Sequence, residues 1–251
     1  MSTKRKIFKI ICGILFTLFL TFFIFDVSLI QITEYDTIKP IIADMVGSQL
    51  GGLMLPPGAD LLISSQCEGQ MEIEFPIPIE SLPLDTLTLN CEEAEADLND
   101  ALISSLVRGL YYTDYDCDVI SCLQTPETSL ALFSYKTNEF LKSMMYVFLI
   151  LTILSGVGLA LSAQGWGIPK SFGLSMIFVG LGYPMLLIVE YALPSMMVST
   201  IPSQAISVAE PIVKGIIDII AFNFLIVLII GIILTIISYV IPKLMKKKTK
   251  R

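Results

Sequence analysis

Four long, uninterrupted runs of apolar residues dominate the hydrophobic pattern of the chain. Each run is long enough to cross a hydrocarbon core of roughly 30 Å as a helix that rises about 1.5 Å per residue. Lipid offers the backbone no hydrogen bonds, and the runs do not alternate between apolar and polar residues, so they predict helices and exclude a barrel. The predicted spans are 7–30, 144–161, 172–193 and 212–241.

The stretch between the first two runs has a mixed pattern that predicts a small folded domain. Apolar residues recur at helical spacing in some parts and alternate with polar residues in others. They predict helices over 37–53, from about 90 through 110, over 119–123 and over 126–141, and strands over 71–80 and 84–89. Pro76 and Pro78 cannot donate to a ladder, so the first stretch should be an edge strand or an extended segment. The sequence thus predicts a mainly α membrane protein, with a four-transmembrane-helix bundle and a small α+β domain between helices 1 and 2.

The distribution of charge orients these spans. Three short segments, 1–9, 162–170 and 242–251, hold 11 Lys and Arg and no Asp or Glu. The segment 33–141 holds 19 Asp and Glu against three basic residues (Lys39, Arg108 and Lys136), a net charge near −16. Lys and Arg favour the cytoplasmic side, so four crossings place both termini and the 162–170 turn in the cytoplasm. Residues 33–141 and a short loop, 194–211, are then expected outside the cell membrane.

The cysteines predict disulfides in the acidic domain. Cys12 lies within the first span, whereas Cys67, Cys91, Cys117 and Cys122 all lie in 33–141. An even number in an oxidising compartment predicts two disulfides, and three pairings are open. Easy local closure favours Cys67 with Cys91 and Cys117 with Cys122. Zinc is the alternative, but the chain has no histidine and no Cys-x-x-Cys pair to support it.

A few polar residues interrupt the spans. Asp26, Glu190, Lys214 and Asp218 form a charged group at the outer ends of spans 1, 3 and 4, with the acids on the order of 30 Å from the inner ends. Such residues can reach the lipid headgroups, which is the expected role here. The alternatives are a polar cluster that joins the spans, with Lys214 paired to Glu190 or Asp218, or the mouth of a cation path. Asn223 lies deeper and predicts a helix-packing contact.

Small residues predict close packing of the second and third spans. They stand at small-xxx-small spacing or repeat along one span, which favours a compact bundle or a dimer face. Pro184 predicts a kink in the third span. The small residues are Gly156, Gly158, Ala160, Ser162, Gly173, Gly180 and Gly182.

No catalytic constellation is present in the sequence. Without histidine there is no Ser-His-Asp or Cys-His pair, and there is no P-loop and no serine elbow. Asp114, Asp116 and Asp118 begin like a calcium loop, but Val119 and Thr125 stand where that loop needs Gly and Glu. The basic tail follows a membrane helix immediately, which favours an anchor at the lipid surface over a nucleic-acid site. We therefore predict no enzyme activity, no metal and no cofactor.

The order of spans and loops resembles the claudin plan, which has four spans and a large first outer loop. The Trp–Cys–Cys signature of that loop is absent, since the single tryptophan, Trp166, lies in the inner turn. Tetraspanins carry their large loop between the third and fourth spans, and their Cys-Cys-Gly motif is also missing. The resemblance is therefore architectural and assigns no residue a role.

Two functions are compatible with this pattern. The leading hypothesis is a non-enzymatic, multi-pass surface protein whose outer domain mediates partner binding or assembly. The partner would be another protein or a second copy, bound through the outer domain or the Gly-rich faces of spans 2 and 3. The alternative is a subunit of a cation channel or transporter that uses the outer-rim acids.

Overall fold

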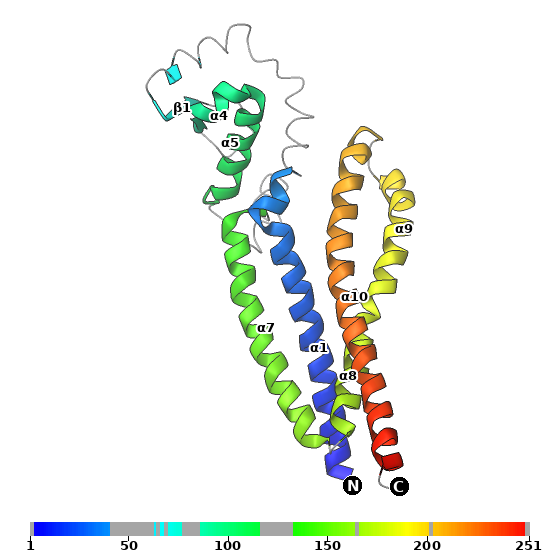
Figure 1. The fold of residues 1–251 in the computed structure, drawn as a ribbon. Helices are drawn as coiled ribbons and strands as arrows, with labels where there is room; N and C mark the ends of the chain where they lie inside the picture. Colours follow the sequence, from blue (N-terminus) through cyan, green and yellow to red (C-terminus); the bar gives the residue numbers. More distant parts are fainter. Residues whose placement is uncertain are drawn as a thin grey trace. The chain divides into compact units, whose positions relative to one another are not determined.

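The computed structural model describes residues 3–40, 63, 66–67, 70–76, 86–115, 133–163, 166–200 and 203–248. The chain divides into two compact units. The helical unit comprises Met1–Gln31 and Leu141–Arg251, and the inter-span domain comprises Ile32–Phe140 (Figure 1).

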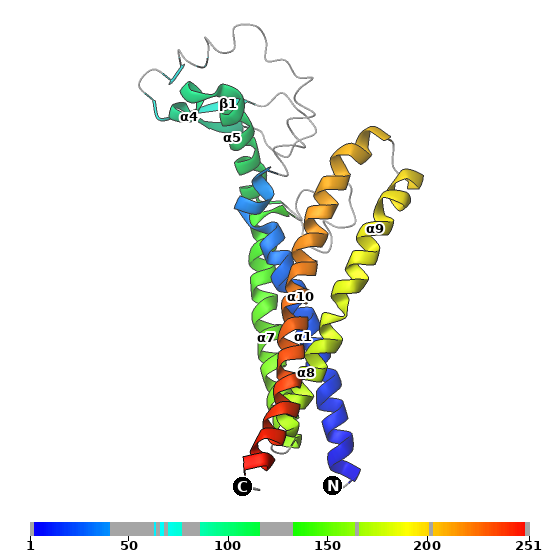
Figure 2. The ribbon, with the colours of Figure 1, turned by 45° about the vertical axis from the view of Figure 1, so that its right-hand side comes forward.

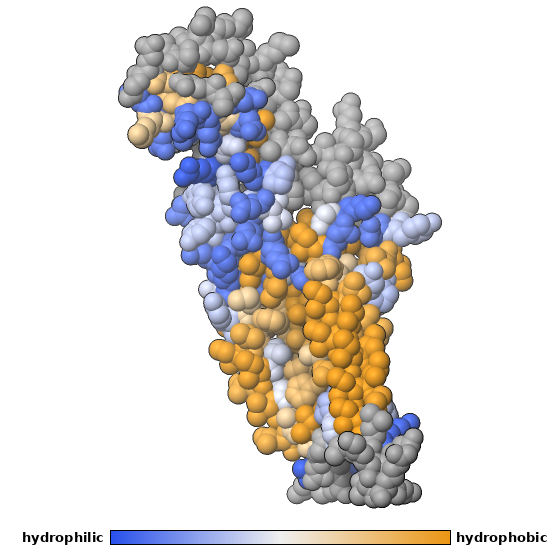
Figure 3. Space-filling view, in the orientation of Figure 1, coloured by the Kyte–Doolittle hydropathy of each residue, from blue (hydrophilic) through white to orange (hydrophobic). Residues whose placement is uncertain are grey.

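All four apolar runs form helices, as predicted. They lie in α1 (Thr3–Thr33), α7 (Tyr135–Ser162), the pair α8 (Gly167–Gly180) and α9 (Gly182–Thr200), and α10 (Ser203–Lys248), which Figure 2 shows from a second side. Within the described residues, four stretches are long and apolar enough to cross a membrane. They are Arg5–Thr33, Tyr135–Ser162, Gly167–Ala192 and Val213–Lys243. Much of their apolar surface is exposed, and hydrophobic residues predominate on the coloured part of the helical unit in Figure 3.

The third run is two helices rather than one. α8 ends at Gly180 and α9 begins at Gly182, with Leu181 between them. Pro184 lies in the first turn of α9, where its missing N–H leaves the carbonyl of Gly180 without its helical donor. The break therefore falls one turn before the proline that predicted a kink.

Helices also extend into the segment 194–211, which the sequence predicted as a loop. α9 runs to Thr200 and α10 begins at Ser203. The segment contains no glycine, and the loop was inferred from where the apolar runs end rather than from turn residues. Helical backbone therefore continues past the ends of the hydrophobic stretches.

Glycine brings α8 and α10 into backbone contact. A Cβ added to Gly180 would lie 2.5 Å from Cβ, 2.6 Å from Cα and 2.8 Å from N of Leu228 on α10. Two turns earlier, Gly173 is equally close to Thr235 and Gly231 of the same helix. Small residues repeated on one face let two helices approach this closely. The glycines predicted to favour tight packing are thus used inside the chain.

The second span packs through its small residues as well. A Cβ added to Gly156 would lie 3.3 Å from the ring of Phe16 on α1 and 3.4 Å from the ring of Phe172 on α8. Those two rings meet edge to face, with their centroids 5.0 Å apart. Gly158 approaches Cys12, where an added Cβ would lie 2.9 Å from Sγ. Both glycines are therefore covered by helices of the same chain.

The inter-span domain contains a two-stranded antiparallel sheet and two helices. β1 (Glu72–Pro76) pairs with β2 (Thr86–Asn90), which confirms a strand in each predicted stretch. Residues 77–80 and 84–85 of those stretches lie outside the described residues. α4 (Cys91–Ala96) and α5 (Leu98–Tyr112) follow. The buried side chains of β2, Leu87 and Leu89, lie in two hydrophobic clusters that α5 completes. The clusters contain Ile38, Leu87, Leu106, Val107, Leu110 and Tyr111, and Ile63, Cys67, Ile73, Leu89, Cys91 and Ala101.

The single helix predicted from about residue 90 through 110 is interrupted at Asp97. The backbone of Asp97 is extended, with φ −155° and ψ 106°. Its Oδ1 accepts the backbone N–H of Asp100 at 3.2 Å, which caps the start of α5. The leucine spacing alone did not reveal this cap. Of the other predicted helices, residues 37–40 and 135–141 are helical, and residues 41–53, 119–123 and 126–132 lie outside the described residues.

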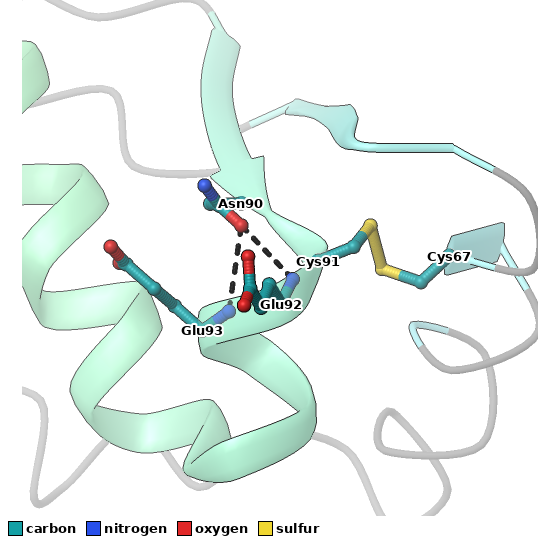
Figure 4. The surroundings of a disulfide bond; sticks show 5 residues. All are labelled: Cys67, Asn90, Cys91, Glu92 and Glu93. Carbon is teal, nitrogen blue, oxygen red and sulfur yellow. Dashed lines mark hydrogen bonds between the residues drawn. A yellow bond between two sulfur atoms is a disulfide. The ribbon is translucent and has the colours of Figure 1, made fainter.

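A disulfide holds the end of β2. Cys67 and Cys91 are bonded, with their Cα atoms 5.4 Å apart, in agreement with the favoured pairing (Figure 4). The residue before Cys91 starts α4, because Asn90 Oδ1 accepts the N–H groups of Glu92 at 2.9 Å and Glu93 at 3.4 Å. Cys117 and Cys122 lie outside the described residues.

Candidate functional site

The structure brings two of the four predicted outer-rim residues together. Lys214 Nζ lies 3.8 Å from Glu190 Oε1, and their side chains are 60% and 25% exposed. An ion pair this open to solvent contributes less than about 1 kcal/mol. The pair links α9 to α10, and each charge therefore already has a partner within the chain.

The other two rim acids are placed differently. Asp218 is exposed on α10 and forms no ion pair with any described residue. Asp26 is only 5% exposed, and its Oδ2 has no hydrogen-bond partner among the described atoms. Asp26 is therefore buried, whereas the sequence predicted a side chain that extends to the headgroups. Depth along the helix placed it at the rim, but depth does not say which way a side chain faces.

Asn223 makes the helix-packing contact that the sequence predicted. Its Nδ2 donates to Ser28 Oγ and to Gln31 Oε1, both at 2.9 Å, and so ties α10 to α1. Ser28 Oγ in turn donates to the carbonyl of Ile24 at 2.8 Å. The amide NH2 of Asn223 is thus hydrogen-bonded to α1 alone.

Replacing Asn223 by leucine should destabilise the helical unit by about 1 kcal/mol, in the range measured for hydrogen bonds between membrane helices. The loss stays small because Ser28 keeps its bond to Ile24. Thermal unfolding in mild detergent measures it, and Phe222→Leu, at an exposed position one residue earlier, serves as the control. A loss above about 3 kcal/mol would mean that Asn223 does more than join two helices.

The inter-span domain contains a polar groove between β2 and α5, which we call the β2–α5 groove. The sequence pattern did not predict it. The groove encloses about 500 Å³, a size typical of ligand sites. One wall is β2 and the other is the face of α5 opposite to its buried leucines. The lining residues are Tyr35, Lys39, Glu72, Thr86, Leu87, Thr88, Asn90, Glu93, Ser104, Ser105, Arg108, Gly109 and Tyr112.

Two of the three basic residues of the acidic segment line this groove. Lys136, the third, forms an ion pair with Asp114 at 3.0 Å. Arg108 and Lys39 form no ion pair with any described residue, although Glu72 and Glu93 also line the groove. The rarity of bases in this segment was the available signal in the sequence. A spare guanidinium beside hydroxyl groups is suited to hold a carboxylate.

A cluster of tyrosines borders the groove. The rings of Tyr111 and Tyr112 lie 5.0 Å apart, those of Tyr35 and Tyr111 5.3 Å, and those of Tyr112 and Tyr135 5.7 Å. Tyr111 is buried and its hydroxyl donates to the carbonyl of Thr33 at 3.1 Å. Burial raises the pKa of Tyr111 to about 12, with a smaller contribution from Tyr112. Burial also raises the pKa of Tyr35, which the charge of Arg108 partly offsets.

The raised pKa of Tyr111 predicts alkaline instability of the inter-span domain. Unfolded tyrosine loses its proton near pH 10, so the unfolded state binds fewer protons than the folded state between about pH 10 and 12. The stabilisation is complete below about pH 10 and is lost as the pH rises toward 12. Tyrosinate absorbance during alkaline titration should show a late phase, and Tyr111→Phe should remove about one tyrosine from it. A titration unchanged by Tyr111→Phe would contradict this.

Nothing in the described part of the chain gathers three metal-ligating side chains. Comparison with known proteins adds no assignment: no family model, no curated protein and no solved structure matches the chain.

Proposed function

We propose that the chain is a four-span integral membrane protein with both termini in the cytoplasm and the inter-span domain outside. The four apolar helices and their exposed apolar surface support the spans. The segregation of 11 basic residues from 19 acidic ones supports the orientation. A disulfide in the domain fits an oxidising compartment.

The proposed topology is tested by tags in intact cells. A tag after Arg251 should be reached by antibody only after permeabilisation, and a tag between Gly51 and Gly52 should be reached before it. Labelling of both tags under the same condition would overturn the topology.

The proposed function is binding of a protein partner by the inter-span domain at the cell surface, without catalysis. The observation that carries it is the β2–α5 groove, where Arg108 and Lys39 face a cavity without an ion pair to any described residue. The Gly-rich faces of α7 and α8 are covered by helices of the same chain, which favours the domain as the interaction surface.

Cross-linking in intact cells, followed by purification in mild detergent, tests this function. We expect a partner whose yield falls at least tenfold with Arg108→Glu. Lys136→Glu is the matched control, since it makes the same kind of charge change in the same domain but outside the groove. A protein that yields no partner, or an equal yield from both variants, would remove the proposal.

One observation favours the alternative, a subunit of a cation channel or transporter. Asp26 is buried, and its Oδ2 is unpartnered among the described atoms, which is costly in a span and is often functional. Cation flux into liposomes should then fall with Asp26→Asn. Glu190→Gln is the comparison, because Glu190 is held by Lys214. Absence of flux in the wild type would eliminate this function.

A further inference from the structure

The outer edge of β2 carries backbone groups that no described residue pairs. Cys91 N donates to Met71 O at 3.0 Å, and the register places Leu89 opposite Ile73. In an antiparallel ladder these hydrogen-bonded positions alternate with positions whose N–H and C=O point away from the neighbouring strand. The backbone of Thr88 therefore points away from β1, and within the described ranges nothing pairs with it.

This open edge lines the β2–α5 groove. Thr86, Leu87, Thr88 and Asn90 are four of the five residues of β2, and all four contribute to its wall. Their exposed threonine side chains lie on the sheet face opposite to the buried leucines. Thr86 and Thr88, whose backbone groups point away from β1 along the strand, therefore both line the groove. The strand itself is roughly 17 Å long at about 3.3 Å per residue.

The opposite wall adds polar groups and charge. Ser104, Arg108 and Tyr112 recur at four-residue intervals on α5, so they form one row facing the groove. Arg108 is the residue of this row with a permanent charge. An edge strand beside a helix, with a cation near the cavity, provides both main-chain hydrogen bonds and one anion contact.

We propose that the β2–α5 groove binds an extended peptide segment, which adds as a third strand to β2 and places one carboxylate at Arg108. The proposal rests on the proposed function, since it names the site and the kind of segment bound. The net charge of the segment 33–141, near −16, disfavours a generally acidic partner. The peptide therefore carries its single carboxylate among neutral or basic residues.

Strand addition would use both the cations of the groove and the outward backbone groups of β2, whereas a small anion would use the cations alone. A small carboxylate would use Arg108 and Lys39 but would not engage the outward backbone of β2. Main-chain pairing supplies affinity with little dependence on sequence, whereas side-chain pockets select the residues. The two modes differ in one testable way, because only a strand uses alternate backbone amides of the ligand.

The test uses the full chain in mild detergent and rhodamine-labelled seven-residue peptides of alternating threonine and valine with two flanking lysines. One aspartate is placed at each position in turn, and fluorescence polarisation measures binding. We expect at least one peptide to bind at micromolar concentration. Methylating its backbone nitrogens one at a time should weaken binding at least tenfold at alternate residues only.

Two variants separate the strand from the anion contact. Thr88→Pro removes an N–H that points away from β1, so it should abolish peptide binding. It leaves the ladder to β1 intact, and proline is tolerated on edge strands, so the variant should still fold. Arg108→Glu should weaken binding at least tenfold, and Lys136→Glu should change it less than twofold. Retained circular dichroism and an intact Cys67–Cys91 bond show that each variant is folded.

Three results would overturn the inference: no binding by any peptide, no alternation in the methylation series, or equal competition by acetate. None of these results concerns the capture of a partner in cells. A partner that is lost with Arg108→Glu would therefore still support the proposed function. Peptide binding that fails together with partner capture would reject both.

Discussion

Gly180→Leu should destabilise the helical unit severely, by at least about 3 kcal/mol. The added side chain would begin 2.6 Å from the Cα of Leu228, which is closer than any packed carbon can approach. The clash is with backbone on both sides, so no rotamer change relieves it and α8 must move away from α10. Separation of these helices also removes the neighbouring contact of Gly173 with Gly231.

The yield of monodisperse protein and its unfolding temperature in mild detergent measure this effect. Gly215→Leu is the matched control, since it puts the same side chain on α10 at a position where an added Cβ meets nothing within 4 Å. The control should keep the wild-type yield. Equal behaviour of the two variants would show that α8 and α10 do not pack through Gly180.

The sequence predicted the helices well because their signal is local. A run of apolar residues reports length and composition directly, and α1, α7 and α10 contain the predicted spans. Helix breaks depend on single side chains instead. Asp97 caps α5 in the middle of a leucine pattern that continues through it, and the pattern alone could not show this.

The candidate site was harder to predict because it depends on which way residues face. Asp26 and Asp218 lie at similar heights by residue count, yet one is buried and the other exposed. Lys39, Thr88 and Arg108 are far apart in the sequence and meet only when α5 packs on the sheet. The sequence did show that basic residues are scarce in 33–141, where Arg108 is one of three.

The Cys67–Cys91 disulfide should stabilise the inter-span domain substantially. Cys67 and Cys91 are 24 residues apart, and closing a loop of that length removes conformational entropy from the unfolded chain worth about 3 kcal/mol. Both cysteines are also buried beside Leu89 and Ile73 in one cluster. Replacing both by alanine therefore removes the cross-link together with two packed sulfur atoms.

The double replacement Cys67→Ala with Cys91→Ala should lower the stability of the domain by about 3 kcal/mol. Limited proteolysis of the full chain under native conditions measures it, since cleavage within 32–140 reports opening of this domain and not of the helical unit. Cys12→Ala, which removes a free buried thiol from α1, should leave that cleavage rate unchanged. Because Cys91 follows directly on β2, the double variant should also lose peptide binding at the β2–α5 groove. A domain that resists protease as well without the bond as with it would show that its apolar clusters alone hold β2 in place.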